Sequence, residues 1–309
     1  MSSTSEPRVV LHPTQGSGIQ RAFESMSGIR LETPAREDVA AALSGAQILV
    51  SYPWRDGFLT PGLRWVQSVS AGTEQFPVKR LREAGVALTS ARGIHGPQVA
   101  EHALALLLAM TRGVGRATMQ RSGRTWEGTE VTEIGGMTMG IIGLGVIGEA
   151  IARRAGALGM RVIGTRRDIT GYEGAADGVV AAEQMDEVFA EADVVVVTLP
   201  GGEATRGMVG TTQLEALEGG YLINVGRGSV VDERALVDAL TEGSLRGAGL
   251  DVFETEPLPA ASPLWDLPNL VMTPHVAGSS PHYGDRLADL FDRNLMAYRG
   301  DGDWINRVV

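Results

Sequence analysis

The segment Gly143-Leu144-Gly145-Val146-Ile147-Gly148 decides the fold of this chain of 309 residues. It follows an apolar run, Met139–Ile142, that predicts a β-strand, and it precedes Glu149–Leu158, which predicts a helix. This glycine spacing is typical of a dinucleotide-binding turn: the first glycine permits the tight turn, the second admits a pyrophosphate and the third lets helix and strand pack closely. We therefore expect a dinucleotide at the helix N-terminus, and a glycine-rich turn without a nucleotide is the less favoured alternative.

The residues about 20 positions after this turn bear on the choice of dinucleotide. In a fold that binds NAD, an acidic residue at the end of the next strand accepts hydrogen bonds from the ribose hydroxyls. Here that position reads Thr165-Arg166-Arg167-Asp168. A guanidinium group matches the oxygens of a ribose 2′-phosphate and stays charged, so the sequence favours NADP(H). NAD(H) stays possible if the arginines are a solvated strand end and Asp168 binds the ribose.

Alternating strand and helix patterns on both sides of the turn predict an α/β protein with parallel strands. A chain of 309 residues exceeds what one hydrophobic core usually serves, so we expect two domains. The strands predicted in the first part are Val9–Leu11, Gln47–Val50, Trp65–Val69 and Val86–Leu88, with helices at Arg36–Leu43 and Phe76–Ala84. The six strands predicted in the second part are Gly140–Ile142, Arg161–Gly164, Val194–Leu199, Tyr221–Val225, Gly247–Val252 and Leu270–Thr273.

Glycine and proline residues at Arg92–Pro97 and Gly278–Pro281 mark two places where the chain would cross between domains, and both are candidate hinges. The amphipathic stretch Tyr283–Tyr298 has no strand of its own to cover, so it could return to the first domain. We expect residues 1–95 with 280–309 to form one domain and residues 96–279 the other. Val99–Thr111 is nearly all apolar and should be buried between domains or subunits.

Composition and charge exclude several classes of protein. The apolar and charged fractions, 43% and 21%, are ordinary for a globular protein, and the net charge of −10 disfavours nucleic acid and membrane partners. The absence of cysteine excludes disulfides, thiolate catalysis and cysteine-type zinc sites, and we expect no metal. The longest apolar run, Ala103–Met110, is too short to span a bilayer, and the first residues lack a signal pattern, so we expect a cytoplasmic protein.

Three further segments end predicted strands, at the sheet edge where open α/β folds bind ligands. They are Asn224–Asp232, Leu250–Pro259 and Thr273–Gly278. Arg227 offers a bidentate clamp for a carboxylate, Glu256 a carboxylate and His275 a proton donor near neutral pH. Taken singly, each of these is better explained as a surface charge, an ordinary acid or a core histidine. We give the remaining histidines a structural role, least securely His95 at a predicted hinge: His12, His95, His102 and His282.

Taken together, these segments resemble the D-isomer-specific 2-hydroxyacid dehydrogenases, a family that includes glyoxylate/hydroxypyruvate reductases. Further motifs of that family are present in Ser68–Thr73, Val99–Ala105, Thr198–Pro200 and Thr205–Met208. The resemblance covers most of the chain. It implies a Rossmann doubly wound parallel sheet with a smaller flavodoxin-like α/β substrate domain, and a homodimer.

The resemblance also implies roles for individual residues. Arg227 would bind the substrate carboxylate and carbonyl, His275 would exchange a proton with the substrate oxygen, and Glu256 would hold His275 and favour its protonated form. The backbone of Ser70, Ala71 and Gly72 would add N–H donors for the substrate carboxylate, and Asp251 would face the nicotinamide carboxamide. The implied cofactor contacts are Gly143, Gly145, Val146, Ile147, Gly148, Thr165, Arg166, Arg167, Leu199, Pro200, Thr205, Val225, Gly226, Asp251 and Gly278.

The implied activity is reduction of a small 2-oxoacid, similar to glyoxylate or hydroxypyruvate, to the D-2-hydroxyacid with NAD(P)H. Glu256 argues against formate oxidation, because the related formate dehydrogenases have glutamine there. A dehydrogenase of L-2-hydroxyacids is disfavoured because its nucleotide domain would open the chain. The alternative from another class is a non-catalytic redox sensor or scaffold that binds NAD(P) in the same fold.

Overall fold

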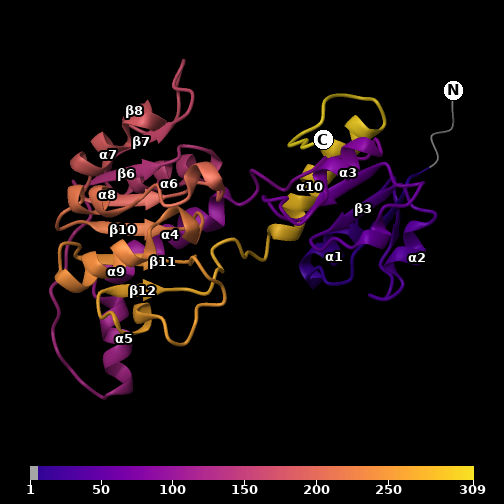
Figure 1. Cartoon of the computed structure of the whole chain (residues 1–309). Helices are drawn as coiled ribbons and strands as arrows, with labels where there is room; N and C mark the ends of the chain where they lie inside the picture. The colour runs from indigo at the N-terminus through magenta and orange to yellow at the C-terminus, as the bar shows by residue number, and fades with distance from the viewer. Residues whose placement is uncertain (1–5) are drawn as a thin grey trace. The chain divides into compact units, whose positions relative to one another are not determined.

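The computed structural model describes residues 6–309, which group into two compact units. One unit contains residues 6–94 together with Ser280–Val309, and the other contains His95–Ser279. Each unit is an α/β structure in which all paired strands are parallel (Figure 1). Within residues 6–309, no helix is both long and apolar enough to cross a membrane.

The first unit has a five-stranded sheet with the order β2-β1-β3-β4-β5, which is the flavodoxin-like order. Alternate residues of each strand face opposite sides of the sheet, so Val9 and Val10 enter two different apolar cores. Helices α1 and α10 contribute to one core, and α2 and α3 to the other. The bounds are β1 (Arg8–Leu11), α1 (Ser17–Glu24), β2 (Arg30–Glu32), α2 (Val39–Leu43), β3 (Ile48–Ser51), β4 (Trp65–Ser68), α3 (Val78–Glu83), β5 (Ala87–Thr89) and α10 (Tyr283–Tyr298).

The second unit has a seven-stranded sheet with the order β12-β11-β10-β9-β6-β7-β8, the doubly wound Rossmann order. Val194 and Val196 of β9 face one core, which includes α4 and α6, and Val195 and Val197 face the other, which includes α7, α8 and α9. The predicted fold class is therefore confirmed. The bounds are α4 (Gly96–Thr111), α5 (Val114–Ser122), β6 (Thr138–Ile142), α6 (Val146–Ala157), β7 (Arg161–Arg166), β8 (Gly178–Ala181), α7 (Met185–Glu191), β9 (Val194–Val197), α8 (Thr211–Ala216), β10 (Tyr221–Asn224), α9 (Glu233–Glu242), β11 (Gly247–Leu250) and β12 (Leu270–Met272).

The structure differs from the predicted elements in several places. The sequence did not predict β2 and β8, two short strands at the sheet edges, nor α5, which has no buried residue. Helices α2 and α3 begin later than predicted, in α3 because Pro77 occupies the N-cap position. Helix α4 is buried within its own unit, against α6 and the strands β10, β11 and β12, so its apolar character needs no second domain or subunit.

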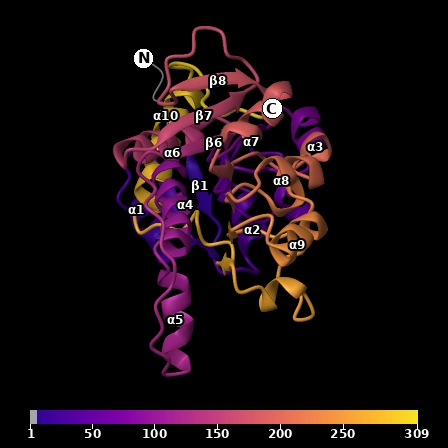
Figure 2. The same cartoon turned by 90° about the vertical axis from the view of Figure 1, so that its left-hand side faces the viewer.

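Helix α5 stands apart from the sheet of its unit. Figures 1 and 2 both show α5 and the segment after it extending away from the sheet before the chain returns to β6. Four large apolar side chains in this stretch are exposed, and the Trp126 side chain is fully exposed. The other three are Val114, Met119 and Val131.

Candidate active site

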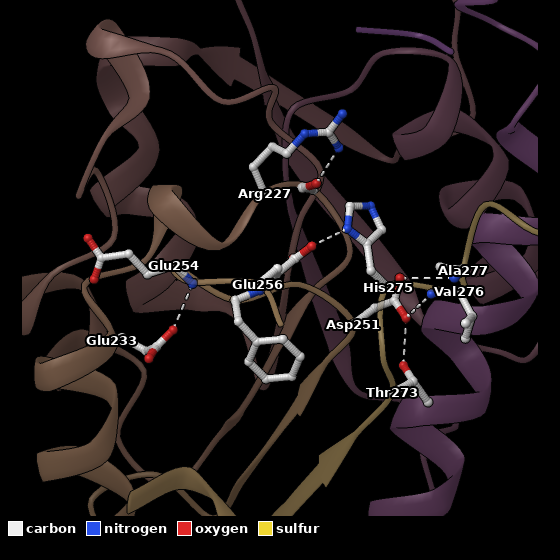
Figure 3. Close-up of polar contacts among 11 residues, drawn as sticks. Arg227, Glu233, Asp251, Glu254, Glu256, Thr273, His275, Val276 and Ala277 are labelled. Atoms are coloured by element: carbon white, nitrogen blue, oxygen red, sulfur yellow. Dashed lines mark hydrogen bonds and ion pairs between the residues drawn. The ribbon is translucent and has the colours of Figure 1, made fainter. Parts of the chain in front are cut away.

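The predicted catalytic side chains lie at one edge of the Rossmann sheet. Arg227 follows β10, Glu256 follows β11 and His275 follows β12, and these three parallel strands are neighbours. Their carboxyl ends therefore meet at the same edge, where α/β folds bind ligands. Figure 3 shows the three side chains there, with the Glu256 carboxylate directed at the His275 ring.

His275 and Glu256 form a hydrogen-bonded pair. Nδ1 of His275 lies 2.6 Å from Oε2 of Glu256, and Oε1 of Glu256 accepts a hydrogen bond from the Phe253 N–H at 3.0 Å. Both carboxylate oxygens are thus engaged, so the carboxylate is fixed in orientation. The His275 side chain is 46% exposed. Since Nδ1 faces Glu256, Nε2 is the ring nitrogen left to exchange a proton with a bound molecule.

Asp251 shapes the loop that carries His275, a role that the sequence did not indicate. Its side chain is buried, and Oδ1 accepts hydrogen bonds from the Thr273 hydroxyl (2.7 Å) and the Val276 N–H (2.9 Å). Oδ2 accepts from the Ala277 N–H at 2.9 Å (Figure 3). The His275 N–H donates to the Asp251 carbonyl at 2.8 Å. His275 has a φ of 52°, a conformation that non-glycine residues rarely adopt, so these hydrogen bonds support a strained backbone.

Arg227 has a charge that no acidic residue among residues 6–309 neutralises by an ion pair. Its Nη1 donates to the Gly226 carbonyl at 2.8 Å, and within residues 6–309 it forms no ion pair. The buried Asn224 side chain shapes this loop: it donates to the Arg227 carbonyl and accepts from the Gly226 N–H, each at 3.0 Å. The exposed guanidinium can therefore pair with an external carboxylate.

The glycine turn has the geometry that a dinucleotide needs. Gly143 has a φ of +107°, which favours glycine, and a Cβ at Gly148 would lie 2.4 Å from the Gly143 carbonyl oxygen. A Cβ at Gly145 would meet no atom within 4 Å, so open space lies beside this residue at the N-terminus of α6, where Val146 and Ile147 begin the helix. These residues fit a bound pyrophosphate.

Two threonines hold the turn in place. The Gly143 N–H donates to Oγ1 of Thr165 at 3.1 Å, and the Thr198 hydroxyl donates to the Gly143 carbonyl at 2.6 Å. Thr165 is buried, at 2% exposure. Its side chain therefore supports the turn through this hydrogen bond.

The other predicted cofactor residues lie in loops at the same edge of the sheet. The Thr205 hydroxyl donates to the Pro200 carbonyl at 2.7 Å, which closes the loop after β9. A Cβ at Gly226 would lie 2.6 Å from the Leu199 carbonyl oxygen, so only glycine lets these two loops approach. Val225 is buried beside Gly226, and the Gly278 carbonyl accepts a hydrogen bond from Gln98 at 3.2 Å.

Arg166 is the last residue of β7, and Arg167 follows it. Within the described residues neither arginine forms an ion pair. The Asp168 carboxylate accepts a hydrogen bond from the Thr170 N–H at 3.0 Å, and this bond lowers the pKa of Asp168 below its ordinary value. The acid is thus engaged with its own loop, and the strand end itself carries positive charge.

Ser70, Ala71 and Gly72 belong to the first unit, directly after β4 and Val69. The Ser70 hydroxyl donates to the Gly72 carbonyl at 2.6 Å and makes this segment a tight turn. Within residues 6–309, the N–H groups of Ala71 and Gly72 donate to no other group. An anion could therefore accept hydrogen bonds from these two backbone N–H groups.

The other histidines have different surroundings. His12 is buried, Nδ1 lies 2.8 Å from the Thr14 hydroxyl, and burial lowers the pKa of His12 from its ordinary value of 6.5. His102 lies on α4, and its Nε2 is 2.8 Å from the Thr273 hydroxyl, so it extends the hydrogen bonds around Asp251. His282 is exposed at the start of α10.

Several known proteins are similar to this chain. Residues 104–277 match the family described as D-isomer specific 2-hydroxyacid dehydrogenase, NAD binding domain. The glyoxylate reductase of Korarchaeum cryptofilum is 36% identical over 249 residues, which cover 77% of this chain and 74% of that protein. Glyoxylate/hydroxypyruvate reductase B of Pectobacterium carotovorum is 39% identical over 252 residues, covering 78% of each.

A solved structure extends the similarity to the whole chain. The NADPH-dependent glyoxylate/hydroxypyruvate reductase of Sinorhizobium meliloti, in complex with NADP and malonate, superposes with a TM-score of 0.78 at 31% identity. The match covers 99% of this chain and 97% of that one. The chain therefore belongs to the D-isomer specific 2-hydroxyacid dehydrogenase family.

Proposed function

We propose that this protein reduces a small 2-oxoacid, of the size of glyoxylate or hydroxypyruvate, to the D-2-hydroxyacid with NADPH. The observation that carries the proposal is the His275–Glu256 pair beside an unpaired Arg227, in a unit whose glycine turn fits a dinucleotide. The names of the relatives from Korarchaeum, Pectobacterium and Sinorhizobium support this substrate class.

Each group of the site has one task in this reaction. Arg227 binds the substrate carboxylate and stabilises negative charge on the carbonyl oxygen, and His275 donates a proton from Nε2 to that oxygen. Glu256 holds the His275 ring in a fixed orientation through the hydrogen bond to Nδ1. When bound, the reduced dinucleotide supplies the hydride that adds to the carbonyl carbon. One hydride and one proton thus convert the C=O group to CH–OH.

The preference for NADPH rests on the end of β7. Arg166 and Arg167 offer two guanidinium groups, neither in an ion pair within residues 6–309, at the position where a fold selective for NAD has an acid. Asp168 is the residue that could replace that acid, but its carboxylate accepts a hydrogen bond from the Thr170 N–H. The Sinorhizobium relative is named as NADPH-dependent, which agrees with this choice.

We also propose a homodimer, because α5 and the segment after it expose Val114, Met119, Trp126 and Val131. Apolar side chains of this size on an extended segment are typical of a surface that a partner covers. Sedimentation of the purified protein at working concentration tests this, and a monomer would refute it.

The test of the activity is steady-state oxidation of NADPH and NADH, each with glyoxylate, hydroxypyruvate, pyruvate and a bulkier 2-oxoacid. We expect turnover with NADPH preferred, a loss of kcat of at least about 100-fold in His275→Ala, and unchanged dinucleotide binding in that variant. His282→Ala is the matched control, since this histidine is exposed and belongs to the other unit. Dinucleotide binding without turnover for any 2-oxoacid would instead favour a redox sensor or scaffold.

A further inference from the structure

The loop between β7 and β8 places an aromatic ring against Arg166. The guanidinium carbon of Arg166 lies 5.9 Å from the centre of the Tyr172 ring, within the range of a cation–π contact. Arg166 is exposed, whereas Tyr172 is half-buried. The Tyr172 ring therefore supports the guanidinium, which forms no ion pair within residues 6–309, although the Asp168 carboxylate is close enough to interact with its charge.

Tyr172 is itself held by the loop around it. Its hydroxyl oxygen accepts a hydrogen bond from the Ala176 N–H at 3.0 Å, and Oε2 of Glu149 accepts one from the Ala175 N–H at 2.8 Å. Glu149 belongs to the first turn of α6, immediately after Gly148. The carboxylate of this residue thus connects the phosphate-binding helix to the loop that carries Tyr172.

Gly174 makes this arrangement possible. A Cβ at this position would lie 2.3 Å from the Tyr172 hydroxyl oxygen and 2.4 Å from Oε1 of Glu149. Any larger residue would displace both side chains from where they now pack. The pKa of Tyr172 is raised, mainly by burial and further by the nearby Glu149 carboxylate, so the phenol stays neutral. A neutral ring presents its negative face to the cation without adding a competing negative charge.

We propose that Tyr172 is a specificity-determining residue: its ring positions the Arg166 guanidinium for the ribose 2′-phosphate, and Glu149 and Gly174 hold the ring in place. This rests on the proposed use of NADPH and names the residues that set the selectivity for it. Tyr172 acts through Arg166, so it is a positioning residue. The discrimination between NADPH and NADH then depends on the loop between β7 and β8, which lies outside the glycine turn.

The test measures dissociation constants for NADPH and NADH by calorimetry, without any substrate. Removing the ring in Tyr172→Leu should weaken NADPH binding about two- to fivefold, the contribution of one cation–π contact at an exposed site, and leave NADH binding unchanged. Tyr172→Phe keeps the ring but loses the hydrogen bond from the Ala176 N–H, so its NADPH affinity should lie closer to that of the wild type than to that of Tyr172→Leu. Gly174→Ala should reproduce the effect of Tyr172→Leu, although both contacting side chains are still present.

A double variant separates positioning from a general structural role. In an Arg166→Leu background, Tyr172→Leu should cause no further loss of NADPH affinity, since the group that the ring positions is already gone. The inference would be overturned if Tyr172→Leu weakened the binding of NADPH and NADH equally. It would also be overturned if Tyr172→Leu lowered the NADPH affinity as much in the Arg166→Leu background as in the wild type. Equal wild-type affinities for the two dinucleotides would also overturn it. Selective binding in a protein without turnover would refute the proposed reduction and leave this inference intact.

Discussion

Two alanine substitutions in the glycine turn should separate stability from cofactor binding. Gly145 has a φ of −96° and a ψ of −161°, which alanine adopts, and its Cβ would meet no atom within 4 Å. Gly148 lies inside α6, where a Cβ would be 2.4 Å from the Gly143 carbonyl oxygen and 3.1 Å from Cγ2 of Ile141. The two substitutions are chemically identical, so their surroundings alone determine the outcome.

For Gly148→Ala the structure predicts a loss of stability. Overpacking typically costs about 1–3 kcal/mol, and here the contacted atom is backbone, which cannot rotate away. The gain in helix propensity, about 1 kcal/mol, offsets only part of this. In a unit of this size each kcal/mol corresponds to about 2–4 °C, so we expect the unfolding midpoint to fall by several degrees.

For Gly145→Ala the structure predicts the opposite pattern. The free energy of unfolding should stay the same or rise by about 0.4–1 kcal/mol, because alanine restricts the unfolded chain. The new methyl group would occupy the space that the pyrophosphate approaches, so the Kd for NADPH should rise at least about tenfold, equivalent to about 1.4 kcal/mol. Thermal unfolding without ligand and binding titration measure the two effects separately. Wild-type affinity in Gly145→Ala, or destabilisation equal to that of Gly148→Ala, would refute the reasoning.

Three further predictions concern single side chains. Glu256→Gln should lower kcat about 10- to 100-fold, since a hydrogen bond to a charged partner contributes about 1.5–3 kcal/mol; a wild-type kcat would show that the charge of Glu256 is not needed. Asp251→Asn should lower the free energy of unfolding in urea by about 1–3 kcal/mol, because an amide cannot accept all three hydrogen bonds from the His275 loop; unchanged stability would contradict this. The folded state disfavours protonation of His12, so the unfolded state binds this proton first, and stability should fall as the pH drops below about 6.5. His12→Gln should show a shallower loss between neutral and mildly acidic pH, and an identical slope would exclude His12 as a cause.

The sequence predicted the central strands and the edge where their side chains meet. Val194–Val197 and Tyr221–Asn224 are continuous apolar or buried runs, and such runs are recognisable because both faces of a parallel strand are covered. Arg227, Glu256 and His275 follow from strand order, since residues just after parallel strands share one edge.

The strands and side-chain contacts that the sequence did not predict lack such a pattern. Strands β2 and β8 lie at sheet edges and consist of partly buried or exposed residues, so no apolar run identifies them. The role of Asp251 depends on three donors that the fold of a later loop supplies. The contact between Tyr172 and Arg166 depends on the path of an irregular loop, which hydrophobic periodicity does not describe.

The position of α10 has a consequence for the order of events during synthesis. Trp65 lies in the core of the first unit, where its ring stacks on Phe291 at 4.6 Å and contacts Trp304 at 5.2 Å. The ribosome adds Phe291 and Trp304 only after all of residues 95–279 have been synthesised. We therefore expect the second unit to fold first. Until α10 is made, the sheet of the first unit exposes an apolar face that chaperones can bind. A stalled or shortened chain that ends before α10 would then lose the unit at its beginning and keep the one in its middle.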